Sequence, residues 1–383
     1  MGDSFLAQTK FASIESHNEF FRKRLTEEME EAKKQETRSV KDVSLQWETR
    51  NYYTNIGIYR IPEEQENWFD GKVTLAHPRS NWKACAVFSM VKDGLLVMTF
   101  KDYECPKHML NGFELLLEFD SFCYDRMFLA LEAMADSQIC QQLLAPSKVA
   151  PRLLDDDDEV ELAPNMPVPN VSQSMAIRST LLPGVHLIQG PPGTGKSFVI
   201  VHIVENLDGR VLICTPSNSA ADHLTSYLVR GGVKVVRMKA KSREMETSIF
   251  EHTVVGKLRT NLAYMAAKSR IHNQTSKKED MFYVEPFEIG ILSQARVVVT
   301  TCSAGADKRL TNIHFTTVII DEATQSIEPT TLIPISLRNE SPERVILVGD
   351  HKQLQPVVLS QLAAGRGHYI AVRETYCSRN AVC

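Results

Sequence analysis

The sequence predicts an α/β protein in which a parallel sheet, covered by helices on two faces, follows a small antiparallel β-barrel flanked by helices. Six short, β-branched runs after residue 170 predict the sheet, because they are apolar throughout and polar or helical stretches separate them. Residues 43–120 predict the barrel, because their short runs of Val, Leu, Phe and Tyr are broken by Pro and Gly at turn-like spacing.

Composition excludes several classes of protein. A chain of 383 residues, 43% hydrophobic and 23% charged, is long enough for two or three packed domains and is neither disordered nor fibrous. The formal net charge is −4, so any nucleic-acid surface is expected to be local. Eight cysteines without a Cys-x-x-Cys pair, and a start without a secretory leader, predict reduced thiols and an intracellular compartment.

The same inspection predicts neither a structural metal nor a membrane partner. Cys105 and His108 have the spacing of half a zinc site, but no second close pair completes it, so a surface turn is the favoured interpretation. Leu6 stands where a myristoylation signal has Ser or Thr, and no apolar run approaches the ~20 residues that span a bilayer.

Changes in sequence pattern predict the order of parts along the chain. Residues 15–36 are dense in Glu, Lys and Arg, with apolar residues at helical intervals, which predicts a long exposed helix. Five consecutive acids at 155–159, followed by prolines, predict a linker. Residues 242–288 are expected to be mostly helical and to form an insertion or a helical subdomain. The predicted parts are an N-terminal helical stalk (1–42), the small β-barrel (43–120), a second stalk helix (121–150), an acidic, Pro-rich linker (151–169), the sheet domain (170–364) and an irregular tail (365–383).

One run matches the Walker A pattern in full. It reads Gly190-Pro191-Pro192-Gly193-Thr194-Gly195-Lys196-Ser197, after a predicted strand ending at Gln189 and before a predicted helix over 198–207. Its glycines let backbone N–H groups face a polyphosphate, and the Lys196 ammonium adds positive potential for the β and γ groups. Ser197 is expected to ligate Mg²⁺.

A second run, residues 317–324, has the character of Walker B. It is a predicted buried strand that ends in two acids, Asp321 and Glu322. Asp321 is expected to hold the magnesium shell, and Glu322 can take a proton from the attacking water. Such a pair alone often only caps a helix, but a Walker A loop on the same sheet favours the catalytic interpretation.

Two glutamines lie where they could contact the nucleotide. Gln173 precedes Gly190 by seventeen residues and has the two-faced amide that recognition of the adenine edge requires, with an exposed helical glutamine as the alternative. Gln353, in the run 347–356, can reach a γ-phosphate or its attacking water and thereby report the nucleotide state to a neighbouring loop.

Small polar residues follow two other predicted strands. Pro216, Ser217 and Asn218 come after one strand, and Thr301 follows another. Hydroxyls, an amide and free backbone N–H groups at the carboxyl end of a strand can hold consecutive phosphates of a single polynucleotide strand, although each segment could equally be a helix N-cap. Six basic residues between 230 and 243 give a local positive segment, for which solvated surface side chains are the favoured interpretation.

The order of these motifs resembles that of superfamily 1 helicases of the up-frameshift type, the RNA helicases of nonsense-mediated decay. Gln173, residues 190–197, 216–218, Thr301, 321–323 and 349–354 resemble motifs Q, I, Ia, Ic, II and III, and the run 240–244 (Ala-Lys-Ser-Arg-Glu) is similar to that family. The resemblance implies a RecA-like P-loop domain below a barrel on helical stalks. It also implies a 5′-to-3′ RNA- and DNA-dependent ATPase that requires Mg²⁺ and grips single strands. The same resemblance implies a cytoplasmic monomer that can shuttle to the nucleus and that has mRNA decay factors as partners.

The sequence also departs from that family. The chain stops 27 residues after Pro356, so the second RecA-like domain is expected to be absent, as is the amino-terminal Cys/His-rich zinc domain. In the resembled family the second RecA-like domain carries arginines that neutralise the γ-phosphate in the transition state. Loss of such an arginine finger costs roughly 10³ to 10⁵ in rate, so the 383 residues alone are expected to bind ATP·Mg²⁺ and hydrolyse it poorly. Two alternatives stay open at this point: a non-translocating module that binds nucleotide and RNA, and a DNA helicase of the same superfamily.

Overall fold

The computed structural model describes residues 11, 13–51, 54–62, 72–86, 88–92, 94–100, 105–144, 160–240, 249–265, 277–350 and 352–360. The acidic run 155–159, residues 241–244, residue 351 and the tail 365–383 lie outside this set. Two compact units are present: the first extends to Arg24 and resumes from Asp125 to Val358, and the second comprises Leu25–Tyr124 with a short segment from Leu359.

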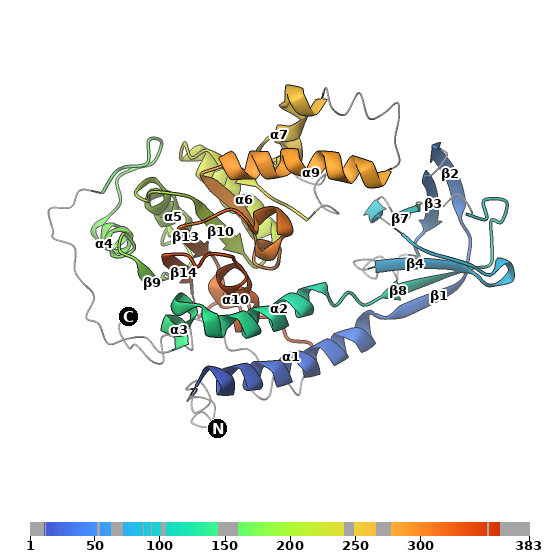
Figure 1. The fold of residues 1–383 in the computed structure, drawn as a ribbon, viewed down its shortest axis with the longest axis horizontal. Helices are drawn as coiled ribbons and strands as arrows, with labels where there is room; N and C mark the ends of the chain where they lie inside the picture. The colour runs from blue at the N-terminus through green and yellow to red at the C-terminus, as the bar shows by residue number, and fades with distance from the viewer. Residues whose placement is uncertain are drawn as a thin grey trace. The chain divides into compact units, whose positions relative to one another are not determined.

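The first unit contains a six-stranded parallel sheet (Figure 1). The sequence predicts six strand runs, at 185–188, 211–214, 233–236, 297–300, 318–320 and 345–348. Five of them lie inside observed strands, and the run 233–236 begins two residues before the observed strand. From one edge to the other the strands are β11 (Val235–Arg237), β12 (Val297–Thr301), β10 (Val211–Thr215), β13 (Thr317–Ile320), β14 (Arg344–Gly349) and β9 (Gly184–Gln189). Because all six are parallel, their carboxyl ends meet at one edge of the sheet, and the loops after them share that edge.

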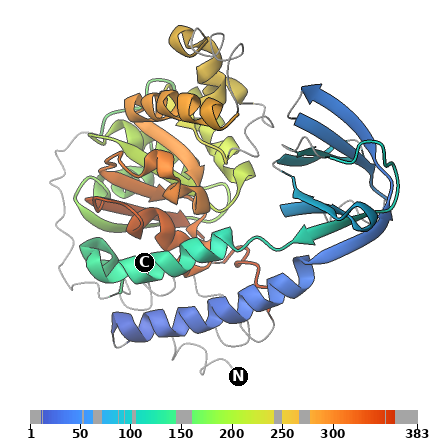
Figure 2. The same cartoon turned by 45° about the vertical axis from the view of Figure 1, so that its right-hand side comes forward.

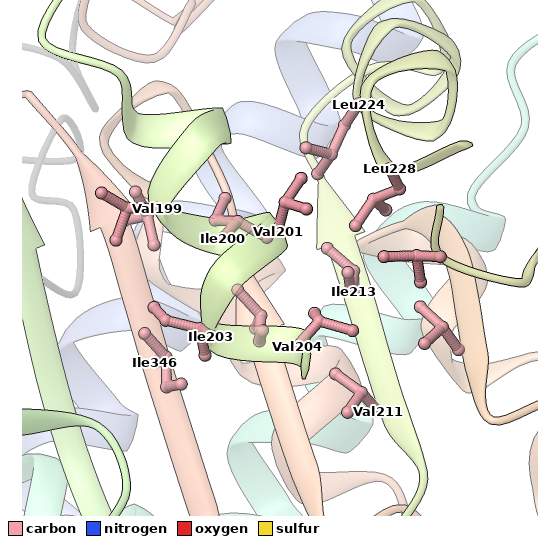
Figure 3. Packing of buried hydrophobic residues seen from close by; sticks show 14 of the residues in the cluster. Val199, Ile200, Val201, Ile203, Val204, Val211, Ile213, Leu224, Leu228 and Ile346 are labelled. Carbon is pink, nitrogen blue, oxygen red and sulfur yellow. The ribbon is translucent and has the colours of Figure 1, made fainter. Parts of the chain in front are cut away.

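Helices cover both faces of this sheet. Val199 and Ile203 of α5, with Leu224 of α6, pack onto one face against strand residues such as Ile213 and Ile346 (Figure 3). The helix α10 packs against β13. Strand residues of both faces are buried, which explains why the runs lack polar alternation. The helices are α4 (Val171–Ser179), α5 (Lys196–Glu205), α6 (Asn218–Arg230), α7 (Val254–Thr260), α9 (Lys277–Gln294) and α10 (Glu328–Ser336), with 3₁₀ turns η6 (Phe250–His252), η7 (Ser303–Ala306), η8 (Lys308–Leu310) and η9 (Ala323–Gln325).

The predicted long charged helix is α1 (Ile14–Glu36), which belongs to the first unit through Arg24 and to the second from Leu25. In the first unit its buried His17 lies 2.7 Å from Glu328 at the start of α10. The amide of Asn18 donates to the Leu131 carbonyl of α2 at 2.6 Å. The predicted helical stretch after residue 120 consists of α2 (Phe122–Ala133), the 3₁₀ turn η4 (Met134–Asp136) and α3 (Gln138–Leu144).

Where the sequence predicts a small barrel, the described residues of the second unit form two four-stranded antiparallel sheets (Figure 2). Their inner residues form one hydrophobic cluster that includes Leu75, Met98, Phe100, Phe113 and Leu115. The sheet β1-β8-β4-β5 has strands Arg38–Val43, Phe113–Glu118, Lys72–His77 and Trp82–Cys85, and a 3₁₀ turn η3 (Pro78–Ser80) joins the last two. The sheet β2-β3-β7-β6 has strands Gln46–Asn51, Thr54–Arg60, Leu95–Phe100 and Phe88–Lys92.

Within the described parts of the chain, no helix combines the length and the apolar character that crossing a membrane requires.

Candidate nucleotide and nucleic-acid site

The loop between β9 and α5 has the backbone shape that its glycines predict. Gly193 and Gly195 adopt positive φ angles of 79° and 86°, a region that side chains with a Cβ rarely enter. The Thr194 hydroxyl donates to the Pro191 carbonyl at 2.8 Å and tightens the turn. At Gly190 a Cβ would lie 2.3 Å from Thr194 Oγ1, so a side chain at this position would displace the Thr194 hydroxyl from its bond to Pro191.

The amino terminus of α5 is left open for an anion. Helices α4, α6 and α7 begin with side-chain caps from Asn170, Ser217 and Thr253, whereas α5, after Gly195, and α10, after Ile327, begin without one. The first N–H groups of a helix have no intrahelical partner and carry the positive end of its dipole. Lys196 Nζ donates to the Gly190 carbonyl at 3.1 Å, which holds the ammonium over the loop.

The Walker B acids follow β13 directly. Asp321 is buried, with 6% of its surface exposed, and its Oδ1 accepts the backbone N–H of Glu322 at 3.0 Å. Glu322 has φ 52° and ψ 38°, a left-handed backbone that is uncommon for a residue with a Cβ and recurs at functional sites. The Gln325 amide donates to Glu322 Oε2 at 3.1 Å and orients that carboxylate.

Burial has a large electrostatic effect on Asp321. Loss of hydration, with a contribution from the neighbouring Glu322 charge, raises the pKa of the Asp321 carboxyl to about 7, although the Glu322 N–H and the Lys196 charge partly offset the rise. The ionised carboxylate is therefore under-compensated by the protein alone. A divalent cation would supply the missing positive charge, so Asp321 fits the role of a ligand to magnesium, and Ser197 at the start of α5 remains its predicted companion.

The segment that follows β14 lies beside the Walker A loop. Strands β14 and β9 pair so that Gly349 stands opposite Gln189, and the Gly190 N–H donates to the Gly349 carbonyl at 3.3 Å. The buried Asp350 accepts from the Gln353 amide at 3.1 Å, so Gln353 is held at the edge that carries the Walker A loop.

The Walker B segment is bonded to the same place. The Thr324 hydroxyl, two residues after Glu322, donates to the Asp350 carbonyl at 3.1 Å. A Cβ at Gly349 would lie 3.1 Å from Thr324 Oγ1 and 3.2 Å from its Cγ2, so the backbones approach closely here. Three motifs that are far apart in the sequence are thus joined, two of them by a backbone hydrogen bond and the third through the Thr324 hydroxyl.

Gln173, at the third position of α4, is bonded to the Walker A loop. Its Oε1 accepts from the Asn170 N–H at 3.0 Å, and Asn170 caps the Gln173 N–H in return, a reciprocal capping box. Its Nε2 donates to the Thr194 carbonyl at 3.1 Å. This side chain therefore links α4 to the loop, and contact with an adenine edge stays a prediction.

The two loops predicted to hold a polynucleotide strand follow the neighbouring strands β10 and β12, which pair with Thr215 opposite Thr301. The Ser217 hydroxyl caps α6 by accepting from the Ala220 N–H at 3.1 Å, so the N-cap alternative applies to this hydroxyl. Pro216 and Asn218 are half-buried and Ser217 is exposed, which leaves the loop open to solvent. Phosphate contacts by these residues stay a prediction.

The positive segment between 230 and 243 is only partly a surface feature. Arg230 and Lys234 reach solvent, whereas Arg237 is fully buried and Lys239 is 4% exposed, and both donate to Asp222 of α6. Sequence inspection gave these side chains no role. The available signal was Asp222 itself, an acid one turn into the helix that follows the predicted strand-binding loop.

Comparison with known proteins agrees with this geometry. The sequence profile of the AAA domain family matches residues 169–286 and 265–361, which together span half of the chain. The chain is 38% identical over 288 residues to "ATP-dependent helicase NAM7" of Saccharomyces cerevisiae, covering 68% of this chain and 28% of that protein. It is 36% identical over 286 residues to "Regulator of nonsense transcripts 1 homolog" of Neurospora crassa, covering 70% and 26%. It is also 35% identical over 288 residues to "ATP-dependent helicase upf1" of Schizosaccharomyces pombe, covering 68% and 30%.

The chain thus spans less than a third of the length of these three relatives. The similarity agrees with the motif order, the parallel sheet and the nucleotide loop: the chain belongs to the AAA domain family and is similar to proteins named as ATP-dependent helicases and as a regulator of nonsense transcripts.

Proposed function

We propose that this chain carries the nucleotide-binding part of an ATP-dependent RNA helicase of the up-frameshift type. It binds ATP with Mg²⁺, hydrolyses it, and couples hydrolysis to binding of and movement along single-stranded RNA. One observation carries the proposal: the Gly190 N–H donates to the Gly349 carbonyl at 3.3 Å, which joins the triphosphate loop to the segment that contains Gln353. Such adjacency is what coupling between nucleotide state and strand binding requires.

The residues divide the chemistry among them. The uncapped N–H groups of α5 and the Lys196 ammonium bind the β- and γ-phosphates. Ser197 and Asp321 hold Mg²⁺, which when bound neutralises charge on those phosphates. Glu322, oriented by Gln325, accepts the proton of the attacking water. The buried location of Asp321 removes competing water from the metal side of the site.

Coupling proceeds through the segment after β14. Gln353 is bonded to Asp350, and the Asp350 carbonyl is bonded to Thr324 of the Walker B segment. Loss of the γ-phosphate would remove a partner from Gln353 and change the position of this segment. Pro216, Ser217, Asn218 and Thr301 are the proposed contacts to the strand, on loops of the same sheet edge.

Nucleotide titration tests the proposed loop. A Lys196→Ala variant is expected to lose binding of a fluorescent ATP analogue by at least about 100-fold, because a desolvated charge pair with phosphate is lost. The matched control is Lys234→Ala, which removes an exposed lysine and should bind as the unmodified chain does. Unchanged affinity in Lys196→Ala would refute the assignment.

The nature of the track needs a separate experiment, because contacts to phosphates do not read the 2′-OH. ATPase stimulation by poly-uridine and by oligo-thymidine is to be compared at equal nucleotide concentration. Stronger stimulation by poly-uridine supports RNA, and equal stimulation favours a track that includes DNA. Binding of RNA without any stimulation of hydrolysis would indicate a non-translocating module instead.

The setting in the cell is proposed from the relatives alone. The printed name "Regulator of nonsense transcripts 1 homolog" supports a place in mRNA decay, with mRNA decay factors as partners. We propose a monomer in the cytoplasm that can shuttle to the nucleus. Sedimentation and fractionation of tagged protein test these two statements.

A further inference from the structure

A buried arginine lies directly behind the loop that is proposed to hold the polynucleotide strand. Arg237 ends β11 and has no exposed surface. Its Nε donates to Asp222 Oδ1 at 2.8 Å, and one of its terminal nitrogens donates to Asn218 Oδ1 at 2.8 Å. A third donor of the same guanidinium bonds the Met238 carbonyl. The planar fork of arginine thus ties the end of β11 to two side chains of α6, Asn218 and Asp222.

A second buried cation completes this arrangement. Lys239 Nζ donates to Asp222 Oδ2 at 2.8 Å, so both oxygens of one carboxylate accept from buried cations. Burial alone would raise the pKa of Asp222, but the hydrogen bonds from Lys239 and Arg237 and their charges lower it overall. The carboxylate is therefore ionised at neutral pH and fixes Arg237 in place.

The contact with Asn218 decides which end of its amide faces outward. A guanidinium has only donors, so the Asn218 oxygen must face Arg237. The two N–H groups of the amide are then the ones left for another partner. Phosphate oxygens accept hydrogen bonds and cannot donate them, so this is the orientation that suits a strand backbone.

The same segment also fixes the second strand-binding loop. The Met238 N–H donates to the Val299 carbonyl at 2.9 Å, and the Met238 carbonyl accepts from the Thr300 hydroxyl at 3.0 Å. Thr300 immediately precedes Thr301, the proposed contact of that loop. Both loops are therefore bonded to the segment 237–238.

We propose that Arg237 is a positioning residue for single-strand binding: from its buried place it turns the Asn218 amide so that the N–H groups meet the phosphates, without touching the strand itself. This inference rests on the proposed function, since it assumes that the loop holds a strand. From the sequence alone, a solvated surface side chain was the favoured interpretation of Arg237.

The test compares Arg237→Lys with the unmodified 383-residue chain. Lysine retains a positive charge beside Asp222, but its single ammonium cannot span Asp222 and Asn218 together. The affinity for fluorescein-labelled oligo-uridine, measured by anisotropy, is expected to fall about tenfold, with affinity for an ATP analogue unchanged. Lysine keeps the positive charge, so the salt dependence of binding does not decide the role, and the readout is oligo-uridine affinity compared with ATP-analogue affinity. Equal losses of both affinities would show a general structural effect and overturn the positioning role.

The matched control is Arg344→Lys. Arg344 is also buried and also spans three partners, the carbonyls of Leu181 and Leu182 and the Thr317 hydroxyl, but it lies at the amino end of β14, away from the loops. Its replacement should lower thermal stability and leave both affinities unchanged. A tenfold loss of oligo-uridine affinity in this control would show that any buried arginine has the same effect, which overturns the proposal.

A double-mutant cycle gives a test that does not rest only on Arg237→Lys, which changes a buried residue. Asn218→Ala replaces a half-exposed side chain, and we expect it to lose as much affinity as Arg237→Lys, with no further loss when the two are combined. Additive losses, or full affinity in Asn218→Ala, would refute the inference. If the unmodified chain does not bind oligo-uridine, the proposed function fails; if it binds and Arg237→Lys binds equally, only the positioning role fails.

Discussion

Replacing Asp321 with asparagine is expected to stabilise the protein free of metal and nucleotide, although it removes a ligand of the proposed site. Burial, with a contribution from Glu322, raises the pKa of the Asp321 carboxyl from 3.8 to about 7. The folded protein therefore keeps a proton that the unfolded chain has already released, and its stability falls as pH rises from about 4 to about 7. Three pKa units at about 1.4 kcal/mol each give about 4 kcal/mol above pH 7.

The amide of Asp321→Asn does not ionise, so this pH dependence should disappear. The stability difference is the free energy of unfolding of the variant minus that of the unmodified chain. From pH 5 to pH 8 this difference is expected to grow by about 2 to 3 kcal/mol. It is smaller than the full value of about 4 kcal/mol because the part of the titration below pH 5 is not sampled. Saturating Mg²⁺ and nucleotide should reverse the order, since only the carboxylate binds the metal with full charge.

The assay is urea unfolding in EDTA at pH 5, 6, 7 and 8, followed by far-UV circular dichroism. All three tryptophans lie between residues 47 and 82, so their fluorescence follows the second unit and serves as an internal control that should not shift. Asp307→Asn is a control for which the expected change in the free energy of unfolding has the opposite sign. Burial alone would raise the pKa of Asp307, but its hydrogen bonds with Arg309 and that charge lower it overall, so this variant should lose stability at neutral pH. If the free energy of unfolding changes with pH in the same way for Asp321→Asn and for the unmodified chain, the reasoning is refuted.

Three further predictions concern the loop and the core. Gly195→Ala is expected to weaken ATP-analogue binding about tenfold in a fluorescence titration, because φ is +86° and the new Cβ would lie 2.9 Å from Gln173 Nε2; equal affinity would contradict this. Gly209→Ala places a Cβ 2.6 Å from Thr316 Oγ1 at φ +80°, so thermal unfolding should show a loss of about 1 to 3 kcal/mol with nucleotide affinity retained. Leu224→Ala opens a cavity where α6 meets the sheet and should cost about 2 to 5 kcal/mol in urea unfolding; a loss below 1 kcal/mol would contradict tight packing there.

Local sequence signals were sufficient for the sheet and the nucleotide loop. The strands are short apolar runs whose composition already requires burial on both faces, and the Walker A run specifies its own turn, glycine conformations and following helix. The left-handed backbone of Glu322 had no such signal, since a glutamate does not favour that conformation by itself. It is imposed by the contacts of the Walker B segment around it.

The buried cations illustrate a second limit. Arg237 and Lys239 occur in a basic stretch whose pattern favours solvent exposure, and their partner Asp222 lies fifteen and seventeen residues earlier. Pairing between them depends on β11 standing close to α6, which follows from the strand order of the complete sheet. Long-range topology, and not local propensity, therefore decides whether these charges face water.

The hydrogen bonds of Gln173 have a consequence for the choice of base. An amide side chain offers two N–H groups and two lone pairs, and the bonds to Thr194 and Asn170 use one of each. One donor and one acceptor remain, which complement N7 and the exocyclic amine of adenine. Guanine presents two acceptors, N7 and O6, on the corresponding edge, so the remaining lone pair would face an oxygen. We therefore expect GTP to compete poorly against ATP, and equal competition by the two would show that the amide serves α4 and the loop alone.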